Sequence, residues 1–84
     1  MLAHKLCFET KDVFIFGEAE PLLDELVECI KNAYEDKGVL AGIVVTEGYE
    51  SYAVEVIVEN IPDVETWDAI LAIARYMLES ILPR

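Results

Sequence analysis

The fold class follows from residues 39–60, VLAGIVVTEGYESYAVEVIVEN. The first part of this segment, residues 39–46, is apolar on both alternating faces, which is typical of an inner strand covered twice or of a strand at an interface. Residues 47–51 supply a turn, and residues 52–59 then alternate between a wholly apolar face and a mixed face. The segment therefore predicts two antiparallel strands whose sheet has one face in the core.

Two amphipathic helices flank these strands. On the amino-terminal side, Pro21 marks the first helical position, apolar residues recur at intervals of three and four over residues 22–34, and Gly38 ends the helix. On the carboxyl-terminal side, Asp63 opens a helix with an apolar stripe over residues 67–82. Each apolar face must be buried against a sheet or against the other helix.

The amino-terminal residues predict a further hairpin. Residues 6–8 and 13–16 are short, aromatic-rich apolar runs, and residues 10–12 between them are typical of a turn. With this hairpin the order of elements is ββαββα. We therefore expect a single α+β domain over residues 1–84, a two-layer sandwich with a mainly antiparallel four-stranded sheet and two helices packed on one face.

The order helix, strand, hairpin turn, strand, helix over residues 20–82 resembles the layout of the small dimerising subunit of the KEOPS tRNA-modification complex. The resemblance lies in the order of elements and not in a motif, so it assigns no role to any residue of this chain. The predicted hairpin over residues 6–16 is an addition to that layout.

The charge of the chain restricts its partners. Its 84 residues include 17 Asp and Glu against 6 Lys and Arg, a formal net charge of −11. Nucleic acids and anionic membrane surfaces attract clustered basic side chains, and the basic residues here form no run, so we expect neither as a partner. The longest apolar run is also about a third of a membrane span. A cation or a basic protein surface would be attracted instead.

The first residues and the cysteines predict a reduced, cytoplasmic protein. Residues 1–4 lack the basic and apolar regions of a secretory signal. Cys7 and Cys29 are expected to be small buried hydrophobic residues rather than reactive thiols. The absence of Gln and the abundance of Glu are typical of thermophilic proteins, whereas the scarcity of Lys is not.

The sequence contains no recognisable catalytic constellation. His4 is the only histidine and lies near a terminus, whereas nucleophilic catalysis needs a positioned base. His4 and Cys7 have a chelating spacing, but a structural zinc site needs four ligands and no second pair follows. The scattered glycines match neither phosphate-binding fingerprint. We therefore predict no catalytic residues and a protein that binds rather than catalyses.

The second predicted helix has more apolar surface than a sheet requires, and this surplus consists of Ala69, Ala72, Ile73 and Tyr76. Small alanines beside an aromatic anchor are typical of the centre of a protein interface, while a helix wedged between the sheet and the other helix would have the same breadth. The leading hypothesis is a non-enzymatic interaction module that binds a protein partner, most simply a second copy of itself.

The second hypothesis is a Ca²⁺ site at an acidic end of the fold. If the strands alternate in direction, Asp12, Glu35, Asp36 and Asp63 lie at the same end. Two of these acids follow the negative end of the first helix, where carboxylates are unfavourable, and Ca²⁺ takes six to eight oxygen ligands of this kind. A merely solvated acidic end is the alternative. A third hypothesis is an acidic decoy that occupies a basic surface meant for nucleic acid.

Overall fold

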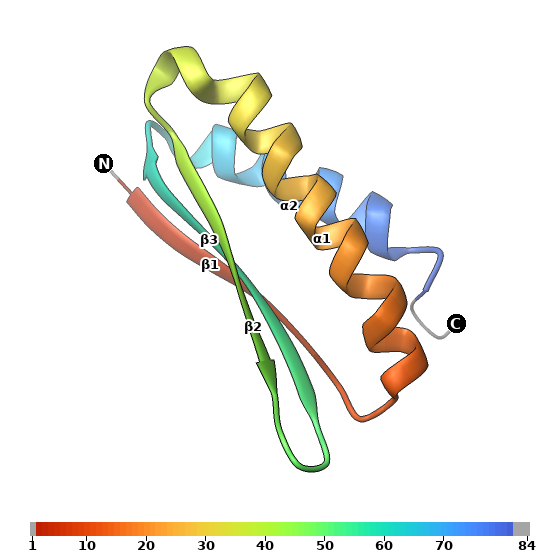
Figure 1. Ribbon diagram of the computed structural model, residues 1–84. Coiled ribbons are helices and arrows are strands. Elements are labelled where there is room, and N and C mark those ends of the chain that lie inside the picture. The colour runs from red at the N-terminus through yellow and green to blue at the C-terminus, as the bar shows by residue number, and fades with distance from the viewer. Residues whose placement is uncertain (1, 82–84) are drawn as a thin grey trace.

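The computed structural model describes residues 2–81. The chain forms an α+β domain with two α-helices and one antiparallel sheet (Figure 1). The elements in chain order are β1 (Leu2–Thr10), α1 (Val13–Tyr34), the short 3₁₀ helix η1 (Glu35–Lys37), β2 (Leu40–Glu47), β3 (Tyr52–Ile61) and α2 (Val64–Leu78).

The sheet has the strand order β1-β3-β2, so the last strand of the chain lies in the centre. β3 pairs antiparallel with β1 and with β2. β1 and β2 therefore run in the same direction on either side of β3, and α1 crosses over from one edge of the sheet to the other. The hairpin predicted from residues 39–60 is confirmed as β2 and β3.

The predicted hairpin over residues 6–16 is wrong, and with it the four-stranded sheet and the order ββαββα. The observed order is βαββα, because residues 13–16 form the first turn of α1. Asp12 caps this helix: its carboxylate accepts hydrogen bonds from the backbone N–H groups of Phe14 at 2.8 Å and Ile15 at 3.3 Å. The β-branched and aromatic residues 13–16 have a local preference for a strand. The Asp12 cap and the burial of Phe16 in the core together stabilise the helix instead.

The helical conformation of α1 is stabilised because it places its apolar residues on one buried face. Phe16 is buried and begins a stripe that continues at helical spacing to Ile30. Pro21, expected at the first helical position, therefore lies inside α1. Proline removes the N–H that would bond to the carbonyl of Gly17 and its ring crowds that carbonyl. Burial on both sides of Pro21 keeps the helix continuous despite this local cost.

Both helices lie on the same side of the sheet (Figure 1). Their buried side chains meet the inward-facing residues of β3, of which Val54, Val56 and Val58 are at most 1% exposed. Two aromatic pairs join the layers: Phe16 stacks on Tyr52, and Trp67 of α2 stacks on His4 of β1, each with ring centroids 4.8 Å apart. The other face of the sheet has no covering element among residues 2–81.

An irregularity in β3 keeps its last residue in the core. The pairing shifts between Leu2↔Ile61 and His4↔Val58, so β3 has one residue more than β1 over this interval. Asn60 lies in the bulge with φ 62°, a left-handed conformation that Asn tolerates better than most residues. Val58 and Ile61 therefore both point into the core, although they are three residues apart.

Candidate interaction surface

The four α2 residues predicted as an interface form one stripe. Ala69, Ala72, Ile73 and Tyr76 have the spacing i, i+3, i+4, i+7, which places them on one side of the helix. All four are exposed, and Ile73 and Tyr76 are 40% and 79% exposed. The residues that α2 buries lie on a different face: Thr66, Ile70, Ala74 and Leu78. Within residues 2–81 no element covers the stripe, so α2 is not wedged between two layers there.

A surface groove adjoins the carboxyl-terminal half of this stripe. It lies between the two helices, has a volume of about 530 Å³ and is lined by Leu22 and Glu25 of α1 and by Tyr76 and Met77 of α2, among others. Leu22 and Met77 are partly buried. The stripe therefore adjoins Leu22 of the neighbouring helix across this groove, and a partner placed on Tyr76 would also contact α1.

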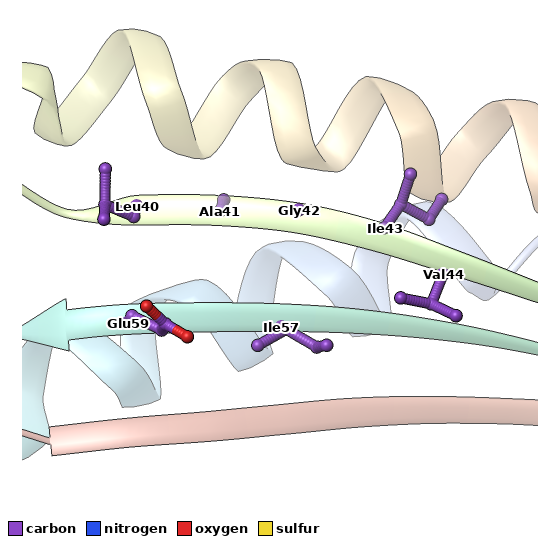
Figure 2. A pocket seen from close by; sticks show the side chains of 7 residues that line it. All are labelled: Leu40, Ala41, Gly42, Ile43, Val44, Ile57 and Glu59. Carbon is purple, nitrogen blue, oxygen red and sulfur yellow. The ribbon is translucent and has the colours of Figure 1, made fainter.

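A second apolar surface lies along β2. Leu40 and Val44 are 56% and 45% exposed on the open face of the sheet. Gly42 lies between them opposite Ile57, and the space that its side chain would occupy is empty. Together these residues line a shallow groove of about 310 Å³ (Figure 2). The apolar run that predicts a doubly covered strand or an interface strand therefore forms an edge strand, which the sequence alone could not show.

The four predicted Ca²⁺ ligands do not lie at one end of the fold. α1 separates Asp12 from Glu35 and Asp36, and its 22 residues span about 33 Å at about 1.5 Å per residue. The expectation that Asp12 shares their end is wrong, because it rested on the hairpin that the chain does not form. In residues 2–81 no group of three or more His, Cys, Asp or Glu side chains is arranged to hold a metal ion.

Asp63 does lie at the same end as the η1 segment. The Asn60 side-chain amide donates to the carbonyl of Gly38 at 3.3 Å and ties the two loops together. The carboxylate of Asp63, however, caps α2: it accepts from the N–H and from the hydroxyl of Thr66, both at 2.7 Å. These hydrogen bonds, with a smaller contribution from Lys37, hold the pKa of Asp63 below its ordinary value. The negative charge of Asp63 is thus already partly balanced by Lys37.

His4 and Cys7 lie on β1, and Cys29 lies on α1. His4 and Cys7 are three residues apart on a strand, so they point to opposite faces of the sheet and cannot chelate one ion. Both cysteines are exposed, not buried as expected. Partial desolvation, followed by the charges of Glu9 and Glu55, raises the pKa of the Cys7 thiol, which reduces its thiolate fraction at neutral pH.

Comparisons of the chain with protein-family models, with curated proteins and with solved structures gave no match. Neither helix in residues 2–81 combines the length and the apolar character needed to cross a membrane.

Proposed function

We propose that this protein is a non-enzymatic interaction module of the cytoplasm that associates through the exposed stripe of α2. The exposed stripe itself, Ala69, Ala72, Ile73 and Tyr76, is the observation that supports this function. Interface centres are enriched in aromatic residues such as Tyr76, and the short side chains of Ala69 and Ala72 leave space beside it for a partner. A second copy of the chain is the simplest partner, because a two-fold axis would place the same stripe on both sides.

The energy of such an interface is concentrated in its two large side chains. Complete burial of an Ile side chain contributes about 1.5–3 kcal/mol, and about 1.4 kcal/mol changes a dissociation constant tenfold. Because Ile73 is 40% exposed and Tyr76 is 79% exposed in the isolated chain, both can bury further surface on association. A two-fold interface contains Ile73 twice, so burial of its remaining exposed part contributes about 1.2–2.4 kcal/mol in total, and its loss should weaken the dimer about tenfold.

The test is sedimentation velocity over a range of protein concentrations, with Ile73→Asp and Tyr76→Glu combined in one variant. We expect the wild type to form dimers at high concentration and the variant to remain monomeric but folded, with an unchanged far-UV circular dichroism spectrum, because neither side chain is fully buried before association. The net charge of −11 opposes self-association, so about 0.15 M salt should be present throughout.

A matched control removes two exposed apolar residues elsewhere. Val13 and Phe14 are 51% and 82% exposed at the start of α1, and Val13→Asp with Phe14→Glu adds the same charge as the stripe variant. This control should still form dimers. If the stripe variant left both stability and assembly state unchanged, the stripe would be the wrong interface, and a monomeric wild type at every concentration would contradict self-association.

A further inference from the structure

The two edges of the sheet differ in how open they are to a further strand. β1 has charged residues along its length, with Lys5 and Glu9 on its open face, and a bulge opposite its first residues. β2 pairs with β3 in regular register from Leu40 to Glu47 and has no charged residue before Glu47. Charges and bulges are the features that protect natural edge strands from pairing. β2 therefore has an unprotected, apolar edge, and in residues 2–81 no strand pairs with its outer side.

Carboxylates of α1 line the helix side of this edge. One groove is bounded by Glu20 and Asp24 of α1 and by Ile43 and Val45 of β2. A second groove continues along the edge, where Glu28, Lys31 and Glu35 face Val39 and Ala41, among others. These carboxylates form an acidic row of Glu20, Asp24, Glu28 and Glu35. The ammonium of Lys31 lies 3.8 Å from the carboxylate of Glu28, but both side chains are largely exposed, so this pair neutralises little of the charge of the acidic row. The helix side of the β2 edge is thus acidic.

This acidic row disfavours a second copy at the same edge. Antiparallel pairing of two β2 strands about a two-fold axis would place the α1 helices of the two copies side by side. Glu20, Asp24 and Glu28 of one copy would then face the same carboxylates of the other, and like charges so placed repel. The edge is therefore apolar enough to accept a strand while its charge selects against self-pairing.

We infer that β2 accepts an extended segment of a partner protein as an added strand, and that this segment alternates basic and apolar residues. An added strand lies about 4.8 Å beyond the edge, and its side chains alternate between the two faces. On the open face they would meet Leu40 and Val44 and the empty space above Gly42 between them, which we call the notch. This apolar surface favours apolar side chains. On the helix face they would approach the acidic row, which favours Lys or Arg.

The probe is an acetylated and amidated peptide of alternating Lys and Val, equal in length to the 8 residues of β2. Binding is followed by backbone amide shifts of the intact protein in about 0.1 M NaCl, where the Debye length is about 10 Å. We expect saturable shifts confined to β2 and to residues 20–28 of α1, with weaker binding at higher salt. A peptide of the same composition with its Lys and Val in two blocks cannot alternate and should bind at least tenfold more weakly.

The protein variants test separately the contribution of the α1 carboxylates and that of the β2 edge to peptide binding. Combined Glu20→Lys and Asp24→Lys should weaken binding about tenfold, since each exposed pair contributes modestly. Glu25→Lys with Glu18→Lys makes the same charge change on the other flank of α1 and should leave the affinity within about twofold. Gly42→Val fills the notch, where an added Cβ meets no atom within 4 Å, and should weaken binding without loss of folding.

Four results would overturn the inference. Equal affinity for the alternating and the block peptide, or equal loss with both pairs of lysine substitutions, would show diffuse electrostatic attraction. Shifts confined to α2 would place the peptide on the other surface. A peptide-free dimer that Gly42→Val disrupts would assign the β2 edge to a second copy, and that result would leave the α2 proposal to its own test with Ile73 and Tyr76.

Discussion

Asp12 and Asp63 show that the same sequence pattern is compatible with two different roles, that of a metal ligand and that of a helix cap. Both are acidic, both precede an apolar run, and both were predicted as Ca²⁺ ligands. In the structure each accepts hydrogen bonds from the first turn of a helix, Asp12 for α1 and Asp63 for α2. An N-cap carboxylate satisfies backbone donors and the positive end of the helix dipole. Their charge is thus already used within the fold.

The cap at Asp63 makes stability depend on pH. Because hydrogen bonds from Thr66 lower the pKa of Asp63, its contribution is complete above the pKa of an unfolded Asp, about 4. It is lost as the pH falls through the lower pKa of the folded state. We expect the free energy of unfolding of the wild type, measured by urea titration, to decline faster than that of Asp63→Ser over this acidic range.

Serine is a matched control because it caps a helix as well as aspartate but does not titrate there. The difference between the two proteins cancels the effect of the other carboxylates, which they share. Parallel pH profiles for the wild type and Asp63→Ser would contradict the assigned hydrogen bonds.

At the scale of elements, α1 is a long helix that contains two unfavourable residues. Gly17 and Pro21 lie inside it, and both have low helix propensity. The hairpin β2–β3 and helix α2 follow their local patterns, because alternation, turn and cap all agree. α1 could not be predicted in full, since its first turn has strand propensity and Pro21 is typical of a helix start. Burial of Phe16 and the residues after it outweighs both signals.

Two glycines test this interpretation with opposite signs. Gly17 is exposed inside α1, and an added Cβ would meet no atom within 4 Å. Gly17→Ala should therefore raise the free energy of unfolding by about 0.5–1 kcal/mol through helix propensity. Gly38 follows η1 with φ 78°, where a side chain is strained, so Gly38→Ala should destabilise the protein. Thermal and urea unfolding measure both, and a loss of stability in Gly17→Ala would contradict a continuous α1.

At the scale of the whole molecule, charge repulsion is the dominant electrostatic feature. The chain has a net charge of −11. Its two described ion pairs are Lys5–Glu55 at 3.7 Å, which is partly exposed, and Lys31–Glu28 at 3.8 Å, which is largely exposed. Exposed pairs contribute little to stability. The compact fold therefore brings carboxylates together with little local compensation, and added salt should stabilise it by screening.

Charge screening also predicts how the melting temperature responds to cations. We expect NaCl and CaCl₂ at equal ionic strength to raise the melting temperature by similar amounts, because α1 holds Asp12 far from Glu35 and Asp36. Differential scanning fluorimetry measures the shift. A clearly larger rise with CaCl₂, lost in a variant with Glu35→Gln and Asp36→Asn, would instead support a cation site at the η1 end.

Local patterns in the sequence are enough to predict the α+β class, the β2–β3 hairpin, the start of α2, the surplus of apolar residues on that helix and the acidic charge. These properties depend on local periodicity, capping and composition, which neighbouring residues establish among themselves. Contacts between distant segments were needed to show that residues 13–16 are helical, that β3 is central and that β2 is an edge beside the carboxylates of α1. They also show that the apolar surplus of α2 is exposed and not wedged between two layers. The physical reason is that strand order and burial depend on contacts between distant segments, and those contacts outweigh local propensity when the core forms.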